Sequence, residues 1–154
     1  MNALHPLRAL LLLCAVAPSV ATLDAAAQAA CDRACLKEVV EDYVAALAAR
    51  DFKRLPLGDA VKYTENGRVL ELGEGFWKTA GAPLAYRDYV LDPESGSAAT
   101  LTALNEYDGI AQMFVRLKVA ERRITEIETI VARIGDQRWF APETLPTLSD
   151  IFAR

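Results

Sequence analysis

The sequence contains a single histidine, His5, which lies in an N-terminal segment that we expect to be removed. The remaining chain therefore lacks the histidine that activates a serine or cysteine nucleophile in the common hydrolases. Only two cysteines remain after that removal, which does not suit a closed zinc site, although carboxylates for a hard cation are still present. We predict a domain that works without a metal and without a cofactor.

Long runs of positive charge are also missing. No run of Lys or Arg exceeds two residues, as at Arg122-Arg123. The chain has 17 basic and 21 acidic residues, and loss of residues 1–30 removes one of each kind, leaving 16 and 20 and a net charge of −4. Binding to nucleic acid calls for a basic stripe. We therefore predict no nucleic-acid partner.

The apolar runs are too short for a membrane span, which needs roughly 20 residues. Residues 9–17 form an apolar run after Arg8, and the Ala-Gln-Ala of residues 27–29 resembles a signal-peptide cleavage site. We predict that residues 1–30 are an export signal and that the mature protein is periplasmic or secreted, without a stable membrane span. An uncleaved anchor and a lipid on Cys31 are the alternatives, and the second is disfavoured because a lipobox usually has an aliphatic residue where this chain has glutamine.

Residues 31–154 have a length that suits one domain with one core, followed by a tail from about residue 135. Cys31 and Cys35 open this domain, and an even number of cysteines in an oxidising compartment indicates a disulfide. Asp32 is a good helix N-cap, which leaves Cys31 outside the helix and free to fold back. A redox role is the alternative, but the usual redox spacing is C-x-x-C.

Residues 32–50 carry apolar side chains at intervals of three and four, which predicts an amphipathic helix. Tyr43 lies in the middle of the apolar stripe. A buried phenol normally finds a hydrogen-bond partner. Tyr43 is therefore either a core residue bonded to a backbone carbonyl or a donor in a functional site.

The pair Asn66-Gly67 between alternating segments predicts a hairpin with a type I′ turn. A two-residue turn fixes the register, so that Glu65 faces Arg68 and Tyr63 faces Leu70, with the continuing pairs 62/71 and 61/72 behind them. A carboxylate at the end of an apolar, tyrosine-bearing face is a candidate acid or base. The alternative is a solvated pair of Glu65 with Arg68 at the tip of the hairpin.

Alternating patterns predict four further strands, at residues 84–91, 98–105, 110–120 and 124–133. The last two are joined by a short turn and should pair antiparallel, which brings Arg116 near Glu126 and Glu128. These charges form either a solvated ladder across the strands or the charged wall of a pocket.

Strand 110–120 is apolar on both faces, whereas a sheet needs only one core face. A second copy of the chain or the tail around Trp139 and Phe140 would cover the other face. We predict a homodimer.

The order of these elements, and several short motifs within them, resemble the NTF2-like superfamily. The motifs are Tyr43-Val44-x-Ala46-Leu47-x-x-x-Asp51, Tyr63-Thr64-Glu65-Asn66-Gly67, Leu72-Gly73-x-Gly75-Phe76-Trp77, and Leu117-Lys118-Val119 followed by residues 124–128. The resemblance implies an α+β fold, a cone in which a curved antiparallel sheet wraps around N-terminal helices. More narrowly, the sequence is similar to exported SnoaL-like proteins with a C-x-x-x-C start and a T-E-N-G hairpin.

The resemblance also implies a catalytic pair. In the isomerase branch of the superfamily, a tyrosine eight residues before the aspartate that ends the first helix donates to a developing oxyanion, and Tyr43 and Asp51 match that spacing. The base of that branch corresponds to Thr64, and Glu65 follows one residue later. The dehydratase branch depends on histidines, so its mechanism does not carry over.

On this basis we expect a cofactor-independent lyase or isomerase for a small, largely apolar, oxygenated organic molecule. Glu65 would be the base or acid and Tyr43 the oxyanion donor. The expected substrate-binding residues are Tyr63, Trp77, Tyr86 and Arg116. The alternative is a non-catalytic module that binds a ligand or dimerises.

Overall fold

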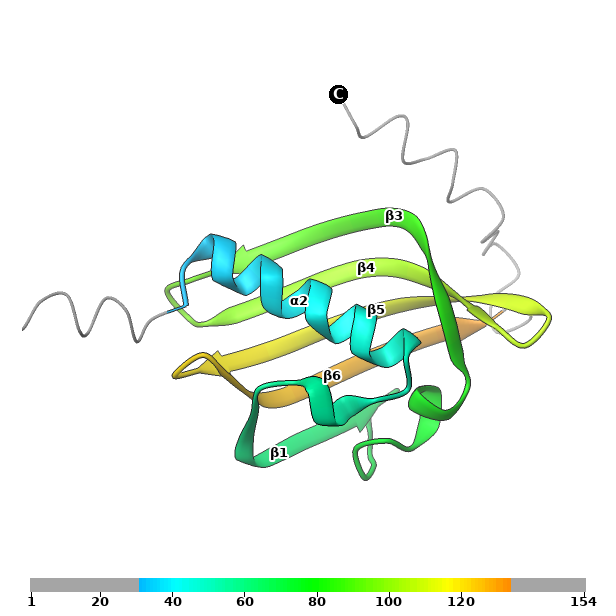
Figure 1. Ribbon diagram of the computed structural model, residues 1–154, viewed down its shortest axis with the longest axis horizontal. Helices are drawn as coiled ribbons and strands as arrows, with labels where there is room; N and C mark the ends of the chain where they lie inside the picture. The colour runs from blue at the N-terminus through cyan, green and yellow to red at the C-terminus, as the bar shows by residue number, and fades with distance from the viewer. Residues whose placement is uncertain (1–30, 134–154) are drawn as a thin grey trace, which may run out of the picture.

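The computed structural model describes residues 31–133 as one layer of sheet with a helix across its inner face (Figure 1). The elements, in chain order, are α2 (Arg33–Ala48), η1 (Phe52–Arg54), β1 (Leu57–Glu65), β2 (Arg68–Val69), η2 (Gly75–Lys78), β3 (Ala80–Asp92), β4 (Ser97–Glu106), β5 (Gly109–Ala120) and β6 (Arg123–Arg133). The predicted export signal and the tail with Trp139 and Phe140 lie outside the described residues. Within residues 31–133 no helix has the length and apolar character needed to cross a membrane.

The predicted helix and disulfide are both confirmed. The carboxylate of Asp32 accepts a hydrogen bond from the backbone N–H of Cys35 at 2.8 Å, which caps α2. Cys31 and Cys35 are bonded, with their Cα atoms 5.2 Å apart. Both cysteines are buried, so the disulfide joins the core at the place where the chain enters the domain.

The sheet has the strand order β2-β1-β6-β5-β4-β3 and curves around α2 (Figure 1). Strands β3 to β6 pair antiparallel with their neighbours, as predicted for β5 and β6. The pairing of β1 with β6 is parallel, and Tyr63 lies opposite Ile127. The curved sheet is therefore antiparallel from β3 to β6, as expected, and is made mixed by the parallel pair of β1 with β6. The strand after the first helix is added to the sheet beside the last strand.

The hairpin register is confirmed near its turn. Asn66 and Gly67 both have positive φ, Glu65 pairs with Arg68, and the N–H of Leu70 donates to the carbonyl of Tyr63 at 3.1 Å. The predicted pairs 62/71 and 61/72 do not form. The strand β2 ends at Val69, and the chain turns away into η2 through two glycines with positive φ.

The two faces of the sheet differ in what covers them. The inner face of β5 and β6 is buried beneath α2 and includes Met113, Val115 and Ile127. The outer face leaves Phe114 37% exposed and Ile130 54% exposed.

Candidate functional site

The most deeply buried polar group on the inner face is the phenol of Tyr43. Its side chain is 0% exposed, and its hydroxyl lies 3.5 Å from Oγ1 of Thr129, at the outer limit of a hydrogen bond. Burial raises the pKa of Tyr43 well above its ordinary value, and the Thr129 hydroxyl offsets only part of that rise. Tyr43 is therefore a neutral donor that lacks a strong acceptor.

The indole of Trp77, carried by η2, lies against Tyr43. The ring centroids are 5.4 Å apart and the rings are nearly perpendicular, and Phe52 packs on Trp77 in the same way at 6.1 Å. Trp77 is 2% exposed, and its Nε1–H has no hydrogen-bond acceptor among residues 31–133. A buried donor without a partner costs about 1–3 kcal/mol. The Tyr43 hydroxyl, with one long hydrogen bond, and the Trp77 N–H, with none within residues 31–133, thus lie on neighbouring rings in the core.

Glu65 points toward the inner face and is not paired with Arg68. Its Oε2 accepts hydrogen bonds from the hydroxyl of Tyr63 at 2.8 Å and from the backbone N–H of Phe76 at 2.7 Å. Arg68 is exposed and makes no ion pair within the described part of the chain. The solvated Glu65–Arg68 pair considered from the sequence does not form, and Glu65 instead fixes the first turn of η2.

The glycine before Phe76 makes this arrangement possible. Gly75 has φ +62°, and a Cβ at this position would lie 2.4 Å from Oε2 of Glu65. Burial raises the pKa of Tyr63, so Tyr63 remains the protonated donor to Glu65. The negative charge of Glu65 also raises the pKa of Tyr43. We call Tyr43, Tyr63, Glu65, Trp77 and Thr129 the tyrosine cluster.

A second carboxylate, Glu106, holds the other end of η2. Glu106 is 8% exposed and accepts from Oγ1 of Thr79 at 2.5 Å and from Nε and Nη2 of Arg133 at 2.5 and 2.8 Å. The Arg133 guanidinium in turn lies 5.8 Å from the centre of the Phe76 ring. Together Glu65 and Glu106 fix the segment that carries Trp77.

The pair of Glu106 with Arg133 was missed from the sequence. Its signal was present, because Glu106 continues the inward-facing alternation of Thr100, Thr102 and Leu104 along β4. A charged residue in a buried register needs a partner of opposite charge. The end of β6, two strands away, supplies that partner.

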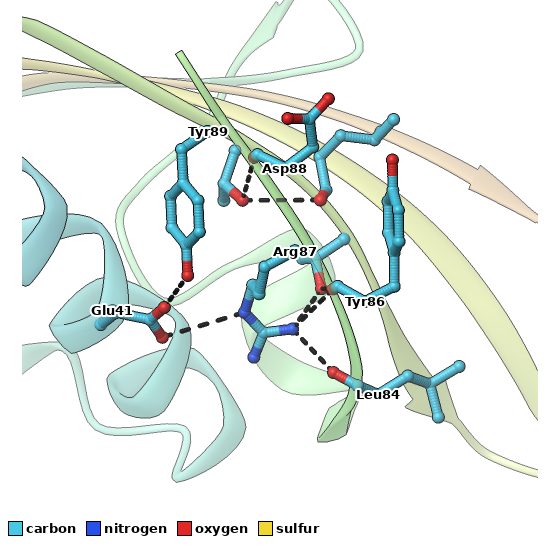
Figure 2. Close-up of polar contacts among 9 residues, drawn as sticks. Glu41, Leu84, Tyr86, Arg87, Asp88 and Tyr89 are labelled. Carbon is cyan, nitrogen blue, oxygen red and sulfur yellow. Dashed lines mark hydrogen bonds and ion pairs between the residues drawn. The ribbon is translucent and has the colours of Figure 1, made fainter. Parts of the chain in front are cut away.

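Two of the expected substrate-binding residues lie elsewhere. Figure 2 shows Tyr86 on the side of β3 that faces away from α2. Arg116 lies on the outer face, where it binds Glu126 at 2.9 Å and Glu128 at 3.0 Å. These three residues line part of a groove of about 240 Å³ on that face. The expected placement of Tyr86 and Arg116 with Tyr43 is therefore corrected, whereas Tyr63 and Trp77 do lie beside it.

A second polar cluster on the inner face joins α2 to β3 (Figure 2). It consists of Glu41, Arg87, Tyr89 and Thr102, which we call the arginine cluster. The Tyr89 hydroxyl donates to Oε1 of Glu41, and Nε of Arg87 lies 3.8 Å from Oε2 of the same carboxylate. The alternation in residues 84–91 did not show which set of side chains faces inward, so the sequence did not predict this cluster.

Neither cluster is a metal site. Across the described residues, no three His, Cys, Asp or Glu side chains come close enough to hold a metal ion.

The fold has clear counterparts among solved structures. A protein of unknown function with a cystatin-like fold from Methylobium petroleophilum is 13% identical with a TM-score of 0.56, covering 73% of this chain and 84% of its own. A candidate ketosteroid isomerase from Kribbella flavida is 14% identical with a TM-score of 0.53, covering 72% and 84%. An NTF2-like protein from Burkholderia xenovorans is 9% identical with a TM-score of 0.51, covering 69% and 95%.

These likenesses show that the chain has the NTF2-like fold, as the sequence motifs implied. At such low identities they show the fold alone. No protein-family model matches the sequence. No curated protein matches it either.

Proposed function

We propose that the tyrosine cluster binds a small, largely apolar organic molecule whose oxygen accepts hydrogen bonds from Tyr43 and Trp77. The observation that carries this proposal is the buried indole N–H without an acceptor, beside a phenol whose one bond is 3.5 Å long. Buried polar groups in folded proteins nearly always have a partner, and an unpaired one calls for an explanation. A ligand oxygen placed between the two donors would satisfy both.

The surroundings of the two donors favour a ligand that is apolar elsewhere. Phe52 packs on the indole, and Phe76 and Leu47 are also fully buried in the same core. Trp77 and Tyr43 are closed off from solvent, so entry of a ligand requires a movement of η2. The short length of η2 and the glycines before it suit such a movement.

A ligand-enrichment experiment tests this proposal. The purified protein is incubated with an extract of the compartment in which it is found, and bound molecules are identified by mass spectrometry. Wild type should enrich a small neutral molecule about tenfold over Tyr43→Phe, the difference expected for one good hydrogen bond. Tyr107→Phe is the matched control, because that phenol is 83% exposed. Equal enrichment by all three proteins, or none by any, would refute the binding site.

We further propose that Glu65 gives this site acid or base chemistry, as a cofactor-independent lyase or isomerase. Its Oε2 is committed to Tyr63 and Phe76, but its Oε1 makes no hydrogen bond within residues 31–133. Glu65→Gln retains an oxygen for the two committed donors and removes the base. Turnover of the identified ligand should then fall by about 10² or more while binding is nearly kept. A ligand that is recovered unchanged from wild type would establish a binding module instead.

Export remains part of the proposal. The basis is the signal pattern of residues 1–30 together with the Cys31–Cys35 disulfide, which suits an oxidising compartment. Intact-mass analysis of the protein recovered outside the cytoplasm should show a chain that begins near Cys31. A retained N-terminus or two thiols that react with an alkylating reagent would contradict this.

The predicted homodimer also remains a proposal. Phe114 pairs with Leu101 and Ile130 across the outer face, so the exposed apolar side chains are contiguous. Val90 extends this surface at the edge of a cavity of about 340 Å³. Light scattering should give twice the monomer mass at micromolar concentration, and Phe114→Lys should give the monomer mass. A monomer mass for wild type would exclude the dimer.

A further inference from the structure

Three cationic side chains lie where α2 packs against the edge strand β3. Arg33, Lys37 and Glu41 follow one another at intervals of four on the side of α2 that faces β3. Nη1 of Arg33 donates to the carbonyl of Leu91 at 2.9 Å, and Nζ of Lys37 lies 4.9 Å from the centre of the Tyr89 ring. Glu41 is the one acid in this row. Arg87, from β3, adds a third cation on the side of α2 that faces this strand.

Arg87 is held in place by one of its terminal nitrogens. Nη1 donates to the carbonyl of Leu84 at 2.7 Å, to that of Tyr86 at 3.0 Å and to Oγ1 of Thr102 at 2.5 Å. These carbonyls lie where the register of β3 against β4 shifts, between Pro83 and Arg87. The side chain thus satisfies backbone acceptors at a bulge, and its guanidinium plane is fixed before any ligand arrives.

The opposite edge of the same guanidinium is unfilled. Nε is buried and makes no hydrogen bond within residues 31–133, and the hydrogen bonds that this guanidinium makes in that part of the chain all leave from Nη1 rather than from Nη2. The ion pair with Glu41 is 3.8 Å long from Nε to Oε2, too long for a hydrogen bond. Burial without full pairing also lowers the pKa of Arg87 from its ordinary value, although an arginine stays charged at neutral pH.

Glu41 is poorly placed to fill this edge. Its Oε1 accepts from the Tyr89 hydroxyl, which holds the carboxylate to one side of the guanidinium (Figure 2). The Glu41 side chain is also 45% exposed, whereas that of Arg87 is 16% exposed. The largely buried guanidinium of Arg87 therefore has a partner that is attached to another donor and is partly solvated.

We propose that the Nε and Nη2 edge of Arg87 binds the carboxylate group of a small organic acid. A planar carboxylate matches the fork of two parallel N–H groups on one guanidinium edge. Lys37 and Arg33, on the side of α2 that faces β3, add to the positive potential near Arg87. This site is independent of the neutral donors of the tyrosine cluster and does not rest on the function proposed for them.

The test is a titration with sodium acetate followed by nitrogen-15 NMR, with sodium chloride exchanged for acetate so that ionic strength stays constant. The Nε–H signal of Arg87 should shift and saturate with a Kd in the range of about 1–10 mM, as expected for one small bidentate ion pair. Glu41→Gln removes the competing carboxylate and should tighten binding by about tenfold. Arg87→Lys keeps the charge but loses the fork and should weaken binding by about tenfold or more.

Two comparisons make the result decisive. Arg116→Lys is the matched control on the outer face and should leave the acetate titration unchanged. Sodium sulfate should bind more weakly than acetate, because a tetrahedral anion fits the planar fork less well. The proposal is overturned if neither wild type nor Glu41→Gln gives a saturating shift, or if sulfate binds as well as acetate. It is also overturned if Arg87→Lys binds acetate like wild type.

Discussion

The two polar clusters on the inner face of the sheet use a carboxylate in opposite ways. In the tyrosine cluster, Oε2 of Glu65 accepts two short hydrogen bonds, from Tyr63 and from the backbone of Phe76, and so becomes part of the framework. In the arginine cluster, Oε1 of Glu41 accepts a hydrogen bond from Tyr89. Its Oε2 lies 3.8 Å from Nε of Arg87, too far for a hydrogen bond. Glu65 thus holds η2 in place, whereas Glu41 does not hydrogen-bond the guanidinium of Arg87.

The donors that remain unpaired differ in charge. The tyrosine cluster leaves a neutral indole N–H, and the arginine cluster leaves a guanidinium N–H. A neutral buried donor is satisfied by a carbonyl or hydroxyl oxygen, whereas a buried cation is satisfied best by an anion. We therefore expect the two proposed sites to differ in ligand class, with neutral oxygenated molecules at the tyrosine cluster and carboxylates at the arginine cluster.

The largest effect should come from breaking the framework of the tyrosine cluster at Gly75. Gly75→Ala strains a residue with φ +62° and places a Cβ 2.4 Å from Oε2 of Glu65. We expect a loss of about 3 kcal/mol, from backbone strain together with the lost hydrogen bonds. Gly67→Ala is the control, because Gly67 has φ +77° but open space around it, and it should cost about 1 kcal/mol. Urea unfolding measures both, and equal losses would show that Glu65 does not depend on Gly75.

The second carboxylate that fixes η2 should give a smaller, pH-dependent effect. Hydrogen bonds from Arg133 and Thr79 hold the pKa of Glu106 below its ordinary value of 4.5. The unfolded chain therefore takes up this proton at a higher pH than the folded protein, and the stabilisation is present above about pH 4.5 and lost as the pH falls through the folded pKa.

Glu106→Gln should accordingly cost about 2 kcal/mol at pH 7 and less at pH 3. Glu71→Gln, at an exposed position, should match wild type at both pH values. Unfolding curves at the two pH values check this. A cost that stays constant with pH would mean that the charge of Glu106 is not what stabilises η2.

Replacing each tyrosine of the tyrosine cluster in turn should distinguish a residue that stabilises the fold from one that is available to a ligand. Tyr63→Phe removes a 2.8 Å donor from a carboxylate and should cost about 1.5 kcal/mol. Tyr43→Phe removes a 3.5 Å contact and should cost less than about 0.5 kcal/mol. Thermal unfolding of the two variants without ligand makes the comparison. The reverse order would assign Tyr43 to the framework and weaken the ligand proposal.

The smallest effect on stability should come from Tyr89→Phe. Glu41 is 45% exposed, so releasing it from the phenol should change the free energy of unfolding by less than about 0.5 kcal/mol. The freed carboxylate should move onto the edge of Arg87, shift its Nε–H signal and compete with acetate. Unchanged acetate binding in this variant would show that Tyr89 does not hold Glu41 away.

The sequence was sufficient for features set by local spacing. The helix with Asp32 as its cap, the disulfide at its start and the register of Glu65 with Arg68 each depend on residues within a few positions of one another. The parallel pairing of β1 with β6 joins segments more than 60 residues apart, and no turn signal announces it. Local patterns do not encode which distant strand completes a sheet.

The contrast between local and distant contacts also decides which parts of the candidate site could be predicted from the sequence. Tyr43, Tyr63 and Trp77 all lie buried in the core, which apolar stripes and aromatic residues can indicate from the sequence. One of the two partners of Glu65 could not be read from side chains, because it is the backbone N–H of Phe76, eleven residues later. The face occupied by Arg87 depends on how β3 is aligned with β4 after the register shifts on either side of Pro83, and the alternation of residues 84–91 does not encode that alignment.

The bulge in β3 also affects how molecules of this protein meet one another. This strand is thirteen residues long and lies at an open edge of the sheet, where a neighbouring chain could add its own strand. Pro83 contributes no N–H, and the register shifts on both sides of it break the regular row of donors and acceptors. We therefore expect strand addition along the whole edge to be disfavoured, and edge-to-edge aggregation at high concentration with it.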